Sequence, residues 1–203
     1  MLFLLVRASP AGYRPRPMWR GLLCVFVLAV IVPVATGGCG EPDDPRLGED
    51  GVSNVSFCDP VALWDDEWVE LEWQALELLN AERSAGATCG DQAFPPAEPL
   101  AMEPALRCAA RFHSLDMSMA RYFDHINRQG EQPADRFGRA GYNPAEAGEN
   151  IAWGQPSAKD AVRQWMADRI DCATIMSPDF VHVGIGYYPD AGPYWTNAVG
   201  APR

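Results

Sequence analysis

A single apolar run near the start of the chain decides the compartment in which the rest of it folds. Residues 21–36 carry no charge, Arg16 and Arg20 precede them, and no acidic residue occurs before Glu41. A basic start, an apolar run and a following stretch of small residues are typical of a secretory signal peptide. The run of about 16 residues is short for a membrane span, which needs about 20. We therefore predict a signal peptide over residues 1–38, with Met18 as an alternative start.

Cys39 follows two glycines and precedes an acidic stretch, an arrangement that resembles the lipidated cysteine of bacterial lipoproteins. Thr36 stands where such proteins usually have leucine, so plain cleavage is the alternative to lipidation. Both outcomes predict a secreted protein or a bacterial cell-envelope lipoprotein. We expect contact with a membrane only through the signal peptide or a lipid on Cys39.

The remaining cysteines predict cross-links in the exported part. Cys24 lies in the predicted signal peptide and Cys39 at its end, which leaves Cys58, Cys89, Cys108 and Cys172. An even number of cysteines in an exported chain favours two disulfides, and four cysteines allow three connectivities. The sequence contains no C-x-x-C pair, which argues against a thioredoxin-like or zinc-ribbon protein.

The charge of the chain excludes one large class of partners. The sequence has 16 Lys and Arg against 27 Asp and Glu, a formal net charge of −11, and Lys159 is its only lysine. Proteins that bind nucleic acid need clustered basic side chains to neutralise phosphates, so we expect no nucleic-acid partner. Residues 39–62 are rich in Gly, Pro, Asp and Glu, which predicts an acidic flexible linker before a folded domain over 63–203.

Hydrophobic periodicity predicts helices first and strands last. Apolar residues recur at helical spacing over 65–84 and from Pro104 to Met117, and shorter helices are predicted over 133–140 and after Ser157. Residues 181–188 alternate apolar and small or polar side chains, and a turn leads to a second such stretch at 194–199, which predicts an antiparallel hairpin. The predicted fold class is α+β.

Four polar residues in apolar surroundings are candidates for a functional site: His125, Glu149, Asp168 and Asp171. An imidazole and carboxylates that converge in a cleft bind a divalent cation or perform acid–base chemistry. The spacing decides neither, and separate roles in helix capping or on the surface are the alternative. The G-x-S-x-G, H-E-x-x-H, P-loop, G-x-G-x-x-G and EF-hand signatures are absent from the sequence.

Eight short motifs, in order along the chain, resemble the CAP superfamily of SCP-like extracellular domains related to cysteine-rich secretory proteins, in its secreted bacterial branch. The motifs are LLNAER at 78–83, HSLDM at 113–117, YFDH at 122–125, AGENIA at 147–152, VRQWM at 162–166, IMSP at 175–178, VGIGY at 183–187 and YWT at 194–196. Each motif is weak alone, whereas eight in family order are specific. The resemblance covers about residues 68–200 and implies an α-β-α sandwich with a small antiparallel sheet between helical layers.

The same resemblance implies a cleft tetrad of two histidines and two acids that can bind a divalent metal. By motif position His125 corresponds to the first histidine, Glu149 to the first acid and Asp168 to the second acid. Asp171 stands where the second histidine is usual, and one imidazole with three carboxylates suits calcium, magnesium or manganese better than zinc, or no metal at all. His182 is a secondary candidate ligand, although an exposed or structural histidine is the favoured interpretation, and His113 is predicted to pack a helix outside the site.

Mainly because of this resemblance, we expect a non-enzymatic binding module for a lipid, a small amphipathic ligand or an envelope component. The alternative is a metal-assisted, peptidase-like hydrolase with His125 and Glu149 as ligand or general base, and a third hypothesis is a structural or partner-binding envelope module. Large aromatic side chains could line an apolar groove, but core packing is the favoured interpretation for each. They are Trp68, Trp73, Trp165, Tyr187 and Trp195.

Overall fold

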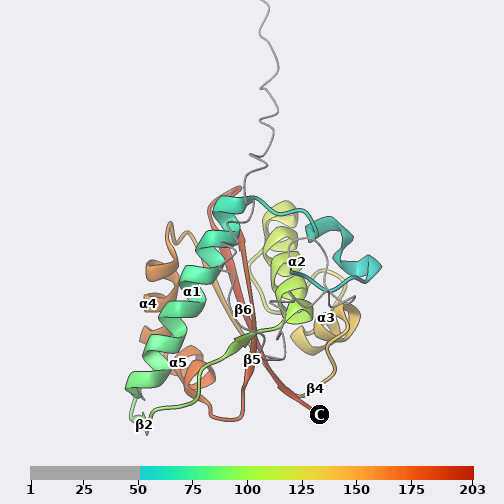
Figure 1. Ribbon diagram of the computed structural model, residues 1–203. Helices are drawn as coiled ribbons and strands as arrows, with labels where there is room; N and C mark the ends of the chain where they lie inside the picture. Colours follow the sequence, from blue (N-terminus) through green and yellow to red (C-terminus); the bar gives the residue numbers. More distant parts are fainter. Residues whose placement is uncertain (1–50) are drawn as a thin grey trace, which may run out of the picture. The chain divides into compact units, whose positions relative to one another are not determined.

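The computed structural model describes residues 51–203, in which a sheet lies between two layers of helices (Figure 1). Helices α1 (Asp66–Ala85), α4 (Ala158–Ala167) and α5 (Arg169–Met176) lie on one side of the sheet, and α2 (Pro104–Ala120) and α3 (Pro133–Ala140) lie on the other. The α+β sandwich predicted from the sequence is confirmed. The predicted signal peptide, the alternative start at Met18 and the lipidation of Cys39 lie outside the described residues.

The main sheet has four strands in the order β3-β5-β6-β4. Strands β5 (His182–Tyr188) and β6 (Tyr194–Pro202) form the predicted hairpin, and β4 (Pro144–Trp153) pairs antiparallel with the other side of β6. The short β3 (Ala101–Met102) runs parallel to β5. A separate two-stranded ribbon, β1 (Ala87–Cys89) with β2 (Gln92–Phe94), completes the set of strands. Strand β4 therefore forms one edge of the main sheet.

The sequence sets the ends of the helices that frame this sheet. The Asp65 side chain accepts a hydrogen bond from the amide of Glu67 at the start of α1, and the Glu103 side chain accepts one from Leu106 at the start of α2. Pro104 occupies the first position of α2, where it costs no hydrogen bond. Gly86 after α1 and Gly141 after α3 have positive φ angles, which glycine adopts without strain.

Close packing joins α2 to the hairpin. Gly184 and Gly186 of β5 face the backbone of α2, and a Cβ at Gly184 would lie 1.9 Å from the carbonyl carbon of Leu106. The Ser114 hydroxyl of α2 donates to the carbonyl oxygen of Gly186 at 2.9 Å. These contacts fix α2, and hence the loop that follows it, relative to the sheet.

Most of the large aromatic side chains pack in the core, as the favoured interpretation holds. Trp165 and Trp195 are fully buried and Tyr187 is nearly so, while Trp68 packs at the margin of the core. Trp73 differs, because it is 42% exposed and stacks beneath the guanidinium of Arg107.

The four cysteines of the described residues form two disulfides, Cys58–Cys108 and Cys89–Cys172. The first ties the segment before α1 to α2, and the second ties β1 to α5. Because α5 carries Asp171, the second disulfide restrains the element that supplies one wall of the candidate site.

The structure differs from the predicted flexible linker over residues 39–62 in the part just before α1, which packs against the domain. Val52, Cys58 and Val61 are buried, and residues Ser56–Val61 form the 3-10 helix η1. These apolar side chains and the Cys58–Cys108 disulfide attach residues 51–62 to the domain, although the surrounding composition is polar. Within the described part of the chain, no helix is long and apolar enough to cross a membrane.

Candidate functional site

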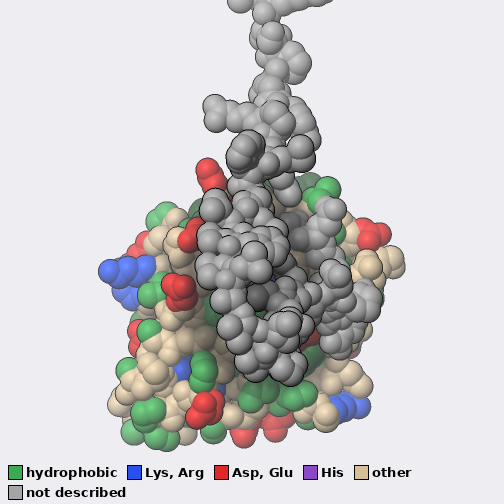
Figure 2. All heavy atoms as spheres, in the orientation of Figure 1, with side chains coloured by type: hydrophobic (Ala, Val, Ile, Leu, Met, Phe, Trp, Pro, Cys, Tyr) green, Lys and Arg blue, Asp and Glu red, His purple; other side chains and the backbone are tan. Residues whose placement is uncertain are grey.

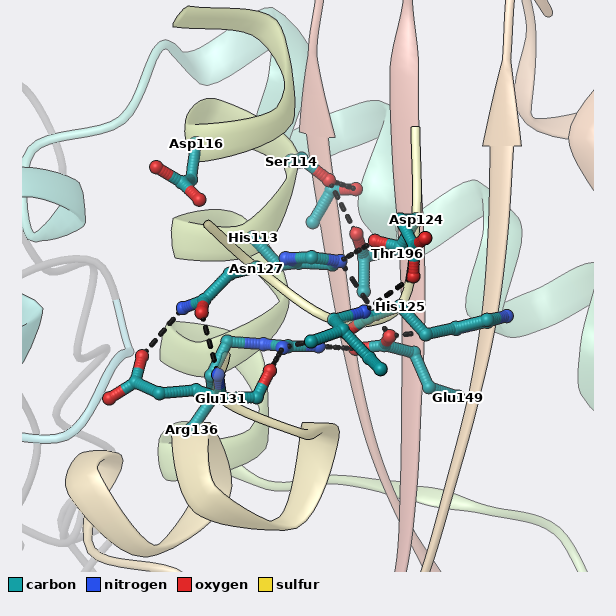
Figure 3. A network of polar contacts seen from close by, with 12 residues as sticks. His113, Ser114, Asp116, Asp124, His125, Asn127, Glu131, Arg136, Glu149 and Thr196 are labelled. Atoms are coloured by element: carbon teal, nitrogen blue, oxygen red, sulfur yellow. Dashed lines mark hydrogen bonds and ion pairs between the residues drawn. The ribbon is translucent and has the colours of Figure 1, made fainter. Parts of the chain in front are cut away.

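An imidazole–carboxylate pair forms the centre of the site (Figure 3). His125 lies in the loop after α2 and Glu149 lies in the middle of β4, and the His125 Nδ1 donates to Glu149 Oε1 at 2.9 Å. The Glu149 side chain is 2% exposed, whereas that of His125 is 47% exposed. The pair therefore presents its imidazole to solvent and keeps its carboxylate inside.

Arg136 of α3 binds the other oxygen of the same carboxylate. Its Nη2 donates to Glu149 Oε2 at 2.6 Å, and its Nη1 donates to the carbonyl oxygens of His125 at 2.9 Å and Glu131 at 3.0 Å. The guanidinium is fully buried, so it neutralises Glu149 and fixes the His125 loop at once. Sequence reasoning missed Arg136; the available indication was its place on the buried side of α3 beside Phe137 and Ala140.

The prediction that His113 lies outside the site is wrong. It is fully buried on α2, as expected, yet its Nε2 lies 3.7 Å from Glu149 Oε1 and donates to the carbonyl oxygen of Asp124 at 3.0 Å. Figure 3 shows His113 and Arg136 directed toward Glu149 from different elements. Helical periodicity revealed the burial of His113 but not the strand residue that it faces.

Burial and hydrogen bonding set the charges of this group. Burial raises the pKa of Glu149, but the hydrogen bond from His125 and the neighbouring positive charge outweigh it, so the pKa falls below its usual value. The hydrogen bond to Glu149 raises the pKa of His125. Burial lowers the pKa of His113 to about 4. At neutral pH the site thus holds an anionic Glu149 and an uncharged His113.

The lowered pKa of His113 predicts a loss of stability in mild acid. A depressed pKa contributes stability above the unfolded value of 6.5, and this contribution is lost as the pH falls toward about 4. The shift corresponds to about 3 kcal/mol, and His125, whose pKa is raised, acts in the opposite direction. We expect His113→Gln, which keeps an N–H donor but cannot titrate, to flatten this decline in urea unfolding between pH 7 and 4. An unchanged decline in the variant would show that another group causes it.

The two aspartates of the candidate set lie on α5. Asp168 caps this helix, since its Oδ1 accepts from the amides of Ile170 at 2.7 Å and Asp171 at 3.0 Å. These hydrogen bonds lower the pKa of Asp168. Asp171 accepts from the Nδ2 of Asn150 at 2.7 Å, while burial raises its pKa. Asp168 thus caps a helix and also lines the cleft described below. The helix-capping interpretation of this residue therefore does not exclude the functional-site interpretation.

A pair of buried amides orients Asp171 from the sheet. Asn150 on β4 donates to Asp171, and the Oδ1 of Asn150 in turn accepts from the Nδ2 of Asn197 on β6 at 2.8 Å. Both asparagines are fully buried. This chain of hydrogen bonds could not be predicted from the sequence, because its members are brought together only by the pairing of β4 with β6 and the approach of α5.

These residues surround an open cleft of about 620 Å³. Its walls are formed by Phe123, Asp124, His125, Ile151, Gln164, Asp168, Ile170 and Asp171. Glu149 lies behind His125 and lines an adjoining hollow of about 400 Å³ together with it. The structure therefore brings all four candidate residues to one region, three in the cleft itself and Glu149 beneath it.

Comparison with known proteins decides the family. The model of the cysteine-rich secretory protein (CAP) family matches residues 76–198, more than half of the chain. The chain belongs to this family. The expectation drawn from the eight motifs is thereby confirmed.

Bacterial CAP proteins are among its relatives. The uncharacterized protein YkwD of Bacillus subtilis is 34% identical over 125 residues, which are 62% of this chain and 45% of YkwD. An extracellular protein with an SCP domain from Bacillus anthracis has a similar structure, with a TM-score of 0.59 and 23% identity over 68% of this chain and 44% of that one. An outer surface protein of Borrelia burgdorferi follows, with a TM-score of 0.54 and 13% identity over 68% of this chain and 95% of that one. The chain spans less than half the length of the curated relatives that it matches.

The polar residues of this CAP domain do not fit a bound metal ion. Here both oxygens of Glu149 are engaged, one by His125 and one by the buried Arg136. Within residues 51–203, no group of three or more His, Cys, Asp or Glu side chains is placed to hold a metal ion. The divalent-metal prediction, in its calcium, magnesium, manganese and zinc forms alike, finds no ligand set in this part of the chain.

His182, the secondary ligand candidate, lies elsewhere in the CAP domain. It begins β5, which is separated from β4 by β6, and its Nδ1 lies 3.0 Å from the hydroxyl of Tyr142. Burial raises the pKa of Tyr142 to about 12, so this hydroxyl stays protonated at neutral pH and shares a hydrogen bond with the His182 ring. His182 is therefore a structural partner of Tyr142, as the favoured interpretation held.

Proposed function

We propose that the protein is an extracellular binding module whose cleft takes an amphipathic ligand with a positively charged group. Two relatives are described as an extracellular protein and an outer surface protein. The two disulfides and the predicted signal peptide agree with that location. A lipid-like amine and a basic peptide of the envelope both satisfy this description of the ligand.

The composition of the cleft walls carries the proposal. Phe123 and Ile170 lie at the cleft and are 46% and 67% exposed, so they offer apolar surface that a ligand would cover. Asp124, Asp168 and Asp171 line the same cleft, and clustered carboxylates attract cations. The whole chain has 27 Asp and Glu against 16 Lys and Arg, and on the face that Figure 2 displays acidic side chains lie beside apolar ones. An amphipathic cation therefore matches the cleft better than a fatty acid does.

The residues of the cleft support the hydrolase alternative less well than they support a binding function. None of the eight residues that line the cleft carries a hydroxyl or a thiol, so the cleft lining offers no nucleophile of the serine or cysteine type. The carboxylate that would orient His125 is already neutralised by Arg136. A water-activating role for His125 remains the competing hypothesis, and it differs from the binding proposal in requiring turnover.

Two amphiphiles of equal chain length and opposite charge test the proposal. We expect decylammonium, measured by titration calorimetry below its micelle concentration, to bind at least tenfold more tightly than decanoate. The double substitution Asp168→Asn and Asp171→Asn should weaken decylammonium binding severalfold, up to about thirtyfold, because each lost carboxylate–cation contact contributes up to about 1 kcal/mol. Asparagine caps helices as well as aspartate does, so α5 should persist.

Glu77→Gln is the matched control, because it removes one negative charge from an exposed position on α1. It should leave the affinity for decylammonium unchanged. Equal affinity for the two amphiphiles, or equal loss in the control and the double variant, would contradict the proposal. Hydrolysis of a peptide or ester substrate that disappears in His125→Ala would favour the enzyme instead.

A further inference from the structure

We infer that the ligand of this cleft is an extended peptide that adds a strand to the free edge of β4, an inference that rests on the proposed binding function. Strand β4 ends the order β3-β5-β6-β4, and no further strand lies beside it within residues 51–203. An edge strand offers backbone donors and acceptors to an incoming chain.

The register shows which backbone groups of β4 face this edge. Gly154, the residue just after β4, donates its amide to the carbonyl oxygen of Pro193 at 2.7 Å. The backbone N–H and C=O groups of even-numbered residues in this strand therefore point toward β6. On the other side of β6, the carbonyl oxygen of Gly200 accepts from the amide of Val181 at 3.4 Å. The backbone N–H and C=O groups of even-numbered residues in β6 therefore point toward β5.

Both observations give the same alternation. Gly148, Asn150 and Ala152 lie opposite Val199, Asn197 and Trp195, respectively, and these are the hydrogen-bonded pairs of β4 and β6. The N–H and C=O groups of Ala147, Glu149 and Ile151 therefore point away from β6, toward the free edge.

Three hollows follow this edge in succession. The hollow behind His125 is lined by Ala147, Gly148 and Glu149, the cleft by Ile151, and a third hollow of about 280 Å³ by Trp153. His125 is common to the first two hollows and Phe123 to the last two, so they form one continuous groove. Because a strand advances about 3.3 Å per residue, the groove from Ala147 to Trp153 extends for about 20 Å and accommodates about seven residues in extended form.

The walls of the groove show that it lies at the edge of the sheet and not over one face. Phe123 and His125 come from the loop after α2, on one side of the sheet, and Asp168, Ile170 and Asp171 come from α5 and its cap, on the other. A ligand between these walls is adjacent to the backbone of β4. A rigid groove parallel to an edge strand suits an extended peptide better than a flexible acyl chain.

The α5 wall carries two carboxylates, Asp168 and Asp171, beside Ile170, whereas the opposite wall carries one, Asp124, beside Phe123 and His125. This difference in charge predicts the pattern of the peptide. Side chains of a strand point alternately to opposite faces of its sheet. One set of peptide side chains would face the carboxylates of Asp168 and Asp171, and the other would face Phe123 and the aromatic hollow of Tyr122, Trp153 and Tyr194. The structure thus favours a peptide that alternates basic with apolar or aromatic residues.

Residue-specific amide hydrogen exchange of the exported chain tests the strand pairing directly. The probe is a blocked octapeptide that alternates lysine with phenylalanine or valine, and its control is the same peptide with every backbone amide N-methylated. We expect the probe to slow exchange at Ala147, Glu149 and Ile151 at least tenfold, with little change at Gly148 and Asn150. The N-methylated peptide should bind at least tenfold more weakly, because it lacks the donors for pairing.

Substitution of Ala147 gives an independent test. Ala147→Pro removes an N–H that faces the free edge, a position where proline is tolerated, and should weaken the probe at least tenfold, whereas Ala147→Val should not. If Ala147→Pro fails to fold, the comparison of the two peptides decides. Equal binding of both peptides, or exchange slowed without alternation, would overturn the strand pairing and leave the cleft proposal standing. Binding of decylammonium without the probe peptide would reject the peptide class alone, and binding of neither would reject both proposals.

Discussion

Replacing Arg136 with methionine is expected to lower the free energy of unfolding of this CAP domain by about 3–5 kcal/mol. Arg136 and Glu149 form a buried ion pair at 2.6 Å, with side chains 0% and 2% exposed. Removing one partner of a buried pair leaves an uncompensated charge inside, and losses of about 3–5 kcal/mol are typical. The substitution also removes the hydrogen bonds to the carbonyl oxygens of His125 and Glu131, so the loop that presents His125 should become mobile.

Arg139→Met on the same helix provides the control for charge and for helix propensity. Arg139 pairs with Glu131 at 2.7 Å, but the two side chains are 50% and 22% exposed, and exposed pairs contribute about 0–1 kcal/mol. Urea unfolding of both variants at pH 7 measures the difference, and the line width of the His125 ring signals in NMR spectra reports the loop. Equal losses in the two variants would show that Glu149 does not depend on Arg136.

Replacing Gly184 with alanine is expected to have an effect of similar size for a steric reason. The added Cβ would lie 1.9 Å from the carbonyl carbon and 2.2 Å from the carbonyl oxygen of Leu106. These atoms belong to the backbone of α2, so the whole helix must move away from β5. Overpacking against side chains costs about 1–3 kcal/mol, and a clash with helix backbone should exceed about 3 kcal/mol or prevent folding.

Gly138→Ala is the matched control, because a Cβ at Gly138 meets no atom within 4 Å. Gly138 lies inside α3, where alanine is favoured over glycine by about 1 kcal/mol. Thermal unfolding should therefore show a lower midpoint for Gly184→Ala and an equal or higher one for Gly138→Ala. A normal midpoint for Gly184→Ala would contradict the close approach of α2 to β5.

The fold could be predicted wherever local patterns persist over several turns of helix or along a strand. The helices over 65–84 and after Pro104 and the β5–β6 hairpin follow from periodicity and turn residues, and they agree with α1, α2 and the C-terminal strands. The strands β1, β2 and β3 have two or three residues each, too few to show a period. The polar composition of residues 51–62 predicts a flexible linker, because Val52, Cys58 and Val61 are few among polar residues. Each of the three is nevertheless buried in the domain.

The four candidate residues of the site could be predicted from the sequence, but the residues that support them could not. His125 and Glu149 belong to recognisable motifs, Asp168 and Asp171 lie between the motifs at 162–166 and 175–178, and the fold gathers all four around one cleft. Arg136 and Asn197 act through contacts that arise only when α3 approaches β4 and when β6 pairs with β4. His113 was identified as buried, but its distance from Glu149 depends on how α2 lies across the sheet. Local sequence encodes which groups are polar, while packing decides which groups meet.

Arg136 binds the carboxylate of Glu149, which distinguishes this region of the CAP domain from a metal site. A guanidinium already neutralises the carboxylate, so the remaining negative charge of the region lies on Asp124, Asp168 and Asp171 at the cleft wall. Those carboxylates line the same cleft as the exposed apolar side chains of Phe123 and Ile170. The charge and the exposed apolar surface of the region therefore support the proposal of a cationic amphipathic ligand.

Native mass spectrometry of the exported chain, purified from an exporting bacterial host without added metal or chelator, tests this central claim most directly. The account predicts a bound molecule or peptide that carries a positive charge together with apolar groups. It should be lost in the double variant Asp168→Asn and Asp171→Asn and retained in Glu77→Gln. A stoichiometric metal ion that disappears in His125→Ala, or an anionic lipid that the double variant retains, would contradict it.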